Sequence, residues 1–251
     1  MRILRRVVLI VVACVGGLAL LAAIIFLAVP GAQKYVPGLQ ATTARFATAA
    51  PVTAAAHPVG VGIAVLADPV WIAKTAAATG IPSRALEAYA GAAINQDVGS
   101  TCGMGWNTLA GIGEVESRHG TIFGGTLAAD GAATPPIFGV TLDGTSTAHV
   151  PDTDRGAIDG DPTGDRAVGP MQLIPEAWRN WHTDGSGDGR EDPQNIDDSA
   201  LAASHYLCRA GKDLSTETGW RTAVLAYNHS DQYLTDIIRY ATLYATEATA
   251  G

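Results

Sequence analysis

The sequence predicts a mainly helical domain that follows a membrane-spanning helix and a flexible linker. An unbroken apolar stretch occupies residues 7–29, and a segment rich in Ala, Thr, Val and Pro follows it. Beyond residue 67 apolar residues recur at helical spacing, and no alternation of apolar and polar residues lasts long enough to build a sheet. We therefore divide the 251 residues into an anchor (1–29), a linker (30–67) and a carboxy-terminal domain (68–251).

The apolar stretch at residues 7–29 is preceded by Arg2, Arg5 and Arg6. At about 1.5 Å per residue it can cross a hydrocarbon core of about 30 Å, and the arginines favour a cytoplasmic N-terminus. A cleaved signal peptide is the alternative, but its apolar region usually spans only about 7–15 residues. A lipid anchor at Cys14 is less well supported, because the apolar run continues past it. We expect a single-pass membrane protein whose domain lies outside the cytoplasm.

The elements of the domain follow from helical spacing and turn residues. Residues 30–67 carry almost no charge and no helical period, which predicts a flexible tether. Residues 123–166 also lack such a period and are dense in Gly, Asp, Pro and Thr, so we expect a long irregular insertion. Helices are predicted at residues 70–79, 83–94, 106–117, 175–181, 199–208, 219–228 and 232–246.

The charges of the chain are unevenly distributed. None of the 24 acidic residues and five of the 16 basic residues precede Asp68, so the domain is strongly acidic. Because such a domain repels phosphate, we expect no nucleic-acid partner.

Cys102 and Cys208 are the two cysteines outside the apolar stretch. An oxidising compartment favours a bridge between them, and two buried free thiols are the alternative. A bridge would close a loop of roughly 105 residues and stabilise the fold by up to about 4–5 kcal/mol in the chain-entropy model.

Glu116 puts a carboxyl group on the apolar face of the helix predicted at residues 106–117. Leu109 and Ile112 fall on the same face one or two turns earlier. Burial raises the pKa of a carboxyl group, which suits a catalytic acid. A buried structural carboxylate is the alternative.

Glu114 and two histidines that flank the motifs are interpreted as structural, supporting or surface groups. Glu114 projects to nearly the opposite side of the helix, where Arg118 is a surface partner four residues later. His119 and His229 show no metal-binding spacing with each other, and we interpret both as supporting or surface groups.

Residues 184–190 place oxygen-bearing side chains at alternating positions followed by glycine, a pattern that wraps a hard cation. A standard twelve-residue calcium loop ends in Glu, where this chain has Asn195. A solvated turn and a sodium ion are alternatives to calcium, and in either case the loop would be structural. The ligands would be Asp184, Ser186, Asp188, the carbonyl of Arg190 and, in a slightly longer loop, Asp198.

Three motifs, taken together, resemble those of the lytic murein transglycosylases. They are Gly-Ile-Gly-Glu-Val-Glu-Ser-Arg-His-Gly at 111–120, Ala-Val-Gly-Pro-Met-Gln-Leu-Ile-Pro at 167–175 with Trp178, and Ala-Tyr-Asn-His-Ser at 226–230 with Tyr233. The resemblance is closest to actinobacterial members of the membrane-bound transglycosylase B type and covers roughly residues 71–240. It implies a lysozyme-like core related to goose-type lysozyme.

The resemblance implies roles for individual residues. The Glu directly before Ser is the general acid/base of that family, which is Glu116 here. The family's calcium loop lies in the matching place and is closed by an Asp, which supports Asp198. Capping amides and core packing are the alternatives for the cleft residues. The residues that would line the sugar cleft are Gln172, Tyr206, Tyr227, Asn228 and, on a loose local alignment, Thr163.

The activity that the resemblance implies is cleavage of peptidoglycan between N-acetylmuramic acid and N-acetylglucosamine, which leaves 1,6-anhydro ends. It implies no cofactor for the chemistry, a structural Ca²⁺ ion in the loop, glycan strands as partners and a monomer. A non-catalytic wall-binding protein is one alternative. A hydrolytic muramidase is another, and its second carboxylate would come from Asp152, Asp154, Asp159, Asp161 or Asp165 of the insertion.

Overall fold

The computed structural model describes residues 44–142, 144 and 150–250, which belong to the unit Thr43–Gly251. The predicted anchor at residues 7–29 lies outside the described residues. Within them, none of the helices combines the length and the apolar character that a bilayer crossing requires.

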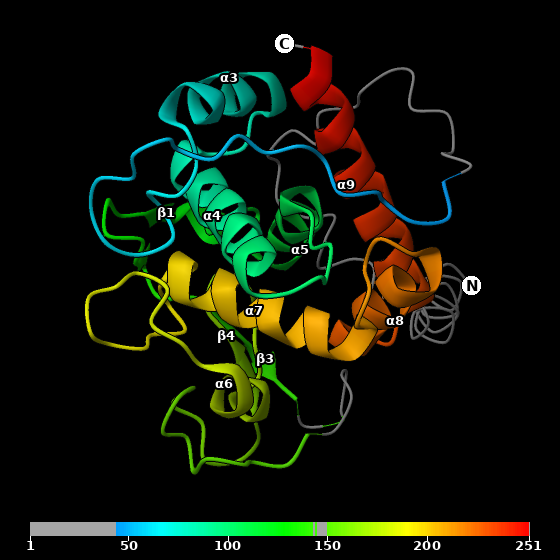
Figure 1. The fold of residues 1–251 in the computed structure, drawn as a ribbon. Helices are drawn as coiled ribbons and strands as arrows, with labels where there is room; N and C mark the ends of the chain where they lie inside the picture. The colour runs from blue at the N-terminus through cyan, green and yellow to red at the C-terminus, as the bar shows by residue number, and fades with distance from the viewer. Residues whose placement is uncertain (1–43, 143, 145–149, 251) are drawn as a thin grey trace, which may run out of the picture. The chain divides into compact units, whose positions relative to one another are not determined.

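Seven α-helices dominate the described residues, which confirms the prediction of a mainly helical domain (Figure 1). The third and fourth predicted helices have the expected bounds, and most of the others extend by a few residues. The helices are α3 (Pro69–Thr79), α4 (Ser83–Gly99), α5 (Trp106–Ser117), α6 (Pro175–Trp181), α7 (Ile196–Gly211), α8 (Glu217–Tyr227) and α9 (Asp231–Ala250).

Helix α5 is the centre of the domain and lies between α4, α7 and α9 (Figure 1). Its residues 106–113 are all buried. Two glycines allow the neighbours to come close: a Cβ on Gly111 would lie 3.2 Å from the Ala241 nitrogen, and one on Gly113 would lie 2.0 Å from the Tyr89 hydroxyl. The first two turns of the helix that carries Glu116 are therefore packed closely against its neighbours, and its last turn is partly exposed.

Residues 44–67, which we call the strap, pack against the helices instead of forming part of a flexible linker. The amide of Asn107 accepts from the Ala50 N–H at 2.9 Å and donates to the Thr48 carbonyl at 3.0 Å and to that of Ala241 at 3.1 Å. Ile63 is buried, and its N–H donates to the Gly185 carbonyl. The predicted boundary at residue 68 thus falls inside the packed unit, because small apolar residues without a helical period can still pack as extended chain.

The insertion (residues 123–166) contains two small antiparallel sheets that the sequence did not predict. β1 (Thr126–Leu127) pairs with β2 (Ala133–Thr134), and β3 (Phe138–Thr141) pairs with β4 (Arg166–Val168). Strands of two to four residues are too short for alternation to be visible in the sequence. A single 3-10 turn, η1 (Ile122–Gly124), joins α5 to β1.

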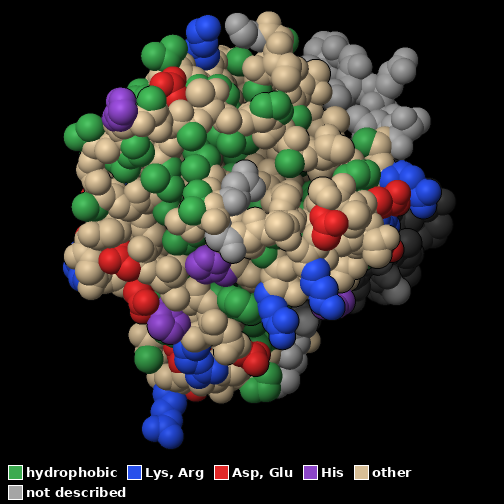
Figure 2. All heavy atoms as spheres, viewed as in Figure 1, with side chains coloured by type: hydrophobic (Ala, Val, Ile, Leu, Met, Phe, Trp, Pro, Cys, Tyr) green, Lys and Arg blue, Asp and Glu red, His purple; other side chains and the backbone are tan. Residues whose placement is uncertain are grey.

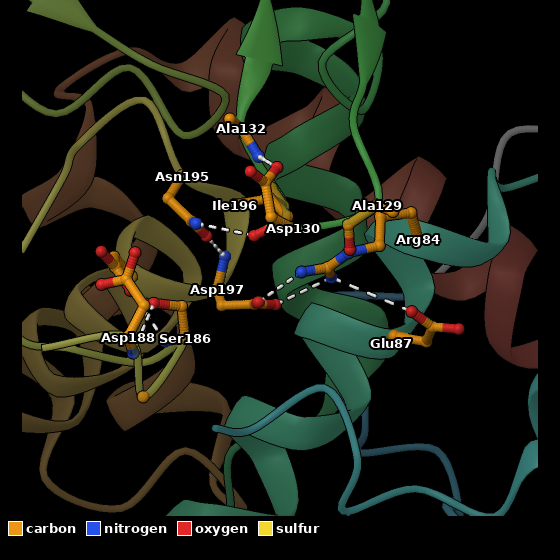
Figure 3. Close-up of polar contacts among 12 residues, drawn as sticks. Arg84, Glu87, Ala129, Asp130, Ala132, Ser186, Asp188, Asn195, Ile196 and Asp197 are labelled. Carbon is orange, nitrogen blue, oxygen red and sulfur yellow. Dashed lines mark hydrogen bonds and ion pairs between the residues drawn. The ribbon is translucent and has the colours of Figure 1, made fainter. Parts of the chain in front are cut away.

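A charged cluster connects α4, the β1–β2 turn and the start of α7 (Figure 3). The Arg84 guanidinium forms two hydrogen bonds with the Asp197 carboxylate, one of them at 2.9 Å, and donates to the Ala129 carbonyl at 3.0 Å. Asn195 caps α7 by accepting from the Asp197 N–H at 2.9 Å. Asp197 is buried, so removing either charge of this pair would leave the other uncompensated.

The expected disulfide forms between Cys102, just before α5, and Cys208 in the last turns of α7. It closes a sequence separation of 106 residues.

Charged side chains lie mainly toward the lower and right margins of the face drawn in Figure 2, and its upper part carries few of them.

Candidate active site

Glu116 lies in the last turn of α5 and is partly buried. The Tyr233 hydroxyl of α9 donates a hydrogen bond to Glu116 Oε1 at 2.7 Å. Burial raises the pKa of Glu116 to about 7, although the hydrogen bond from Tyr233 favours the ionised form. The carboxyl group is therefore poised to give and take a proton near neutral pH.

Glu114 does not face the solvent opposite Arg118. Its Oε2 lies 3.1 Å from His119 Nε2 and accepts from the Tyr244 hydroxyl at 3.3 Å. Burial alone would raise the pKa of Glu114, but its hydrogen bonds with His119 and Tyr244 outweigh burial and lower it. The two glutamates of α5 thus differ in their protonation at neutral pH, one easily protonated and the other ionised.

A tight turn at residues 169–172 lies against the end of α5. The Ser117 hydroxyl donates to the Pro170 carbonyl at 2.6 Å, and the Tyr227 hydroxyl donates to the Met171 carbonyl at 2.6 Å. Gly169 is necessary there, because its φ is +75° and a Cβ would lie 1.7 Å from the Pro193 oxygen. These bonds bring the first and second sequence motifs together in space.

Gln172 ends this turn in the left-handed region, with φ at 49°. Its amide donates to the Gly169 carbonyl at 2.9 Å, and its Oε1 would lie 2.9 Å from a Cβ placed on Gly139 of β3. A non-glycine residue with positive φ costs of order 1–3 kcal/mol, and such residues cluster at functional sites.

Four aromatic side chains, one from each of four helices, form a row that begins at Glu116, and we call them the aromatic row: Tyr233, Tyr227, Tyr206 and Trp181. The ring centroids are 6.5 Å apart for Tyr227–Tyr233, 5.7 Å for Tyr206–Tyr227 and 6.2 Å for Trp181–Tyr206. The Tyr206 hydroxyl donates to the Ala226 carbonyl at 2.6 Å, which fixes its ring. Such a row of rings can bind the apolar C–H faces of sugars.

The remaining predicted cleft residues are both exposed. Asn228 ends α8, and its N–H donates to the Val224 carbonyl at 3.1 Å. Thr163 lies in the insertion, where its hydroxyl donates to Asp161 at 2.6 Å. The hydrogen bonds of Thr163 therefore connect it to the insertion and not to the Glu116 side chain.

The loop at residues 184–190 is organised around two carboxylates. Asp184 accepts from the N–H groups of Gly187 at 2.6 Å and Gly189 at 2.8 Å. Asp198 closes the loop by accepting from the Ser186 N–H at 2.8 Å. Burial raises the pKa of Asp198 to about 6, and the charge of Asp184 adds to this rise. Asp188 turns its carboxylate toward the Arg190 side chain at 3.2 Å.

The acidic residues of the insertion hold its turns together. Asp154 accepts from two backbone N–H groups, and Asp165 accepts from the N–H and the hydroxyl of Thr153. Oxygens of Asp152, Asp154 and Asp165 lie within 4.8 Å of one another, which gives this cluster room for an ion.

Two members of the site were not singled out from the sequence. Tyr233 belongs to the third motif, but its bond to Glu116 could be inferred only by placing it on the helix that crosses α5. Trp181 could have been suspected from its position one turn after Trp178 at the end of a short helix.

No protein-family model matches the sequence, and no curated protein sequence does either. Two solved structures show a distant likeness: the Escherichia coli lytic transglycosylase Slt35 in complex with bulgecin A, and the same protein in complex with calcium. Each is 15% identical to this chain, with a TM-score of 0.43, and the match covers 72% of this chain and 76% of that one.

Proposed function

We propose that this protein is a peptidoglycan lytic transglycosylase with Glu116 as its single general acid/base. The observation that carries the proposal is a partly buried carboxyl group whose pKa is raised to about 7 and which lies at the end of the aromatic row. The three motifs that resemble the family contribute Glu116, the 169–172 turn and Tyr227, and hydrogen bonds connect them.

The reaction needs one proton donor and an internal nucleophile. Protonated Glu116 gives its proton to the glycosidic oxygen as the bond from that oxygen to C1 of N-acetylmuramic acid breaks. The C6 hydroxyl of the same sugar attacks C1, and its proton returns to the Glu116 carboxylate. One group thus acts first as acid and then as base, and intramolecular attack avoids the entropy cost of bringing in a water molecule.

The surroundings of Glu116 favour this reaction over hydrolysis. Burial and the Tyr233 hydroxyl account for the pKa of Glu116. The hydrolytic alternative needs a second carboxylate to act as nucleophile or to activate water. The candidates in the insertion instead accept hydrogen bonds from its own turns.

The substrate contacts that we propose extend along the row. Tyr227, Tyr206 and Trp181 would stack against successive sugars, and Gln172 and Asn228 would donate or accept hydrogen bonds at their polar edges. Tyr233 would keep the acid oriented through its hydrogen bond. For Thr163, which the family resemblance alone suggests, a contact would require glycan to reach the insertion.

We also propose a structural calcium site in the loop at residues 184–190. The oxygen-only donor set fits a hard cation: the carboxylates of Asp184, Asp188 and Asp198, the Ser186 hydroxyl and the Arg190 carbonyl. Ser186 already connects Asp184 and Asp198 through hydrogen bonds. Bound calcium would stabilise the start of α7 and take no part in the proton transfers.

The cellular location follows from the sequence alone and stays a proposal. The apolar stretch at residues 7–29 would anchor the chain in the cell membrane, with the domain facing the wall and acting as a monomer. Glycan strands would be its partner, and the acidic domain would not bind nucleic acid.

Digestion of purified wall sacculi tests the proposal. The protein should release fragments that end in 1,6-anhydro-muramic acid by mass spectrometry, and Glu116→Gln should lower the rate at least about 1,000-fold. Gln96→Ala, which removes a buried amide that bonds Ser204 and belongs to none of the proposed substrate contacts, is the control and should keep the activity. Reducing ends would indicate a muramidase, and binding without cleavage would indicate a wall-binding protein.

A further inference from the structure

A second group of polar side chains lies behind Glu116, and we call it the His119 cluster: Tyr89, Glu114, His119 and Tyr244. His119 is only 3% exposed. Its Nδ1 lies 3.2 Å from the Tyr89 hydroxyl, and its Nε2 lies 3.0 Å from the Tyr244 hydroxyl and 3.1 Å from Glu114 Oε2. Both ring nitrogens thus have partners, and the partners come from α4, α5 and α9.

The backbone at this point is in an uncommon conformation. Arg118, His119 and Gly120 follow one another with φ values of 52°, 58° and 81°. Left-handed conformation is unfavourable for a non-glycine residue, so two such residues in sequence need strong local support. The His119 N–H donates to the Gly113 carbonyl at 2.8 Å, and the Gly120 N–H donates to the Ser117 hydroxyl at 2.8 Å.

The cluster and Glu116 are attached to the same two helices. On α9, Tyr233 bonds Glu116 and Tyr244 bonds the cluster, with three helical turns between them. On α5, Glu114 and Glu116 are two residues apart and face these two tyrosines separately. A shift of the turn after Ser117 would therefore move the Glu116 carboxyl relative to Tyr233.

We propose that His119 is a positioning residue: it locks the end of α5 between α4 and α9 and thereby holds the Glu116 carboxyl against Tyr233. It touches no substrate in this role. The inference rests on the proposed function for its kinetic consequence, but not for its structural one.

Three variants of the full chain test the kinetic consequence. His119→Phe keeps an aromatic ring and removes the polar contacts with Tyr89, Tyr244 and Glu114, and it should lower kcat about 10- to 100-fold with KM within about twofold. His119→Gln, which can still bond one tyrosine, should recover much of that loss. If His119→Phe does not fold, Tyr244→Phe removes one partner and should lower kcat by a smaller factor.

Gln96→Ala is the matched control, because it deletes a buried hydrogen bond to Ser204 between α4 and α7. It should lower the melting temperature without a comparable loss of kcat. The proposal is overturned if His119→Phe and Gln96→Ala lower the melting temperature by the same amount and also lower kcat by the same factor.

A readout that does not depend on activity separates this inference from the proposed function. The groups facing Glu116 are Tyr233 and Tyr227, and those facing His119 are Glu114, Tyr89 and Tyr244. A loosened turn would admit water to Glu116 and weaken its bond to Tyr233, and these changes act on its pKa in opposite directions. Because burial is the larger of the two influences, carboxyl-labelled protein titrated by NMR should show the pKa fall by about one pH unit in His119→Phe. An unchanged pKa contradicts the inference even if the wild-type protein cleaves no glycan.

Discussion

At the scale of single residues, Glu114 and Glu116 lie in one turn of α5, but their surroundings shift their pKa values in opposite directions. Burial raises the pKa of Glu116 to about 7, against the hydrogen bond from the neutral Tyr233 phenol, which lowers it. Glu114 meets His119 and Tyr244, which lower its pKa against the effect of burial. Only Glu116 is suited to donate a proton at neutral pH.

Tyr233→Phe should move the pH dependence of cleavage upward. The Tyr233 hydroxyl favours the ionised form of Glu116, so its removal raises the pKa of the acid. Wild-type kcat/KM should fall as pH rises through about 7, because the reaction begins with protonated Glu116. In the variant this fall should begin at higher pH in a kcat/KM profile. A midpoint that stays in place or moves down would contradict the role of this hydrogen bond.

Glu116→Gln should make the protein more stable at alkaline pH. The folded-state pKa is raised from 4.5 to about 7, so the folded protein holds a proton that the unfolded chain has lost. The wild-type free energy of unfolding should therefore decrease as pH rises through this window, by up to about 3 kcal/mol, and the variant should lack this decrease.

Glu114→Gln is the control, with the opposite sign. Because the pKa of Glu114 is lowered, its charge stabilises the fold at neutral pH, and that stability is lost as pH falls through the lowered pKa. Urea unfolding at pH 5 and pH 8 measures the effect of Glu116, and urea unfolding at pH values below 4.5 measures that of Glu114. Equal pH dependence in wild type and Glu116→Gln would show that burial does not raise the pKa of Glu116.

The sequence could single out Glu116 as the candidate acid but could not show its partners. Helical spacing placed Glu116 on the face of Leu109 and Ile112, and the structure buries both. The same spacing paired Glu114 with Arg118, but this holds only while the helix continues. Arg118 is already left-handed, so the chain turns back and brings His119 to Glu114 instead.

At the scale of elements, the candidate site is formed where five helices meet, and no single helix forms it. The aromatic row takes one ring each from α6, α7, α8 and α9, and the acid comes from the last turn of α5. Each helix was predictable from its apolar period. The meeting of these side chains at one site was not predictable, because it depends on the packing angles between the helices, which the spacing of residues does not encode.

Trp181→Ala should weaken substrate binding more than chemistry. Trp181 is the last ring of the aromatic row when the ring-to-ring contacts are followed from Glu116, so its ring can contribute only to binding. KM for long glycan strands should rise about tenfold with kcat within about twofold. Val70→Ala, which trims an exposed apolar side chain of α3, should leave both constants unchanged. A fall in kcat alone would contradict the role of Trp181 in binding.

Calcium should raise the melting temperature if the loop at residues 184–190 binds it. A free calcium concentration of about 100 times the dissociation constant would raise the free energy of unfolding by about 2.7 kcal/mol, and a chelator should reverse this stabilisation. Asp198→Asn should remove this response, whereas Asp152→Asn in the insertion should retain it. The reverse pattern would move the ion to the insertion, and no response in the wild type would contradict a site in this protein.

At the scale of the whole molecule, the packed unit is larger than the sequence suggested. The strap adds buried residues such as Ala47 and Ile63 and satisfies the polar groups of Asn107 and Trp106 on the central helix. Its lack of charge and periodicity made it look like a tether, since extended chain that packs through backbone hydrogen bonds leaves no pattern in the sequence.

A fragment that begins at Ala44 should therefore fold, whereas one that begins at Asp68 should not fold stably. The shorter fragment leaves the amide of Asn107 and the indole N–H of Trp106 without their strap partners, and each such loss costs about 1–3 kcal/mol. Thermal unfolding followed by circular dichroism compares the two. Equal melting temperatures would show that the strap contributes no stability.

The most direct test of the central claim, a lone acid whose substrate supplies its own nucleophile, is digestion of glycan strands in ¹⁸O-labelled water. If Glu116 acts alone, water takes no part, and mass spectrometry should find anhydro ends without ¹⁸O. One ¹⁸O atom at each newly formed reducing end would show that water is the nucleophile and would contradict the account.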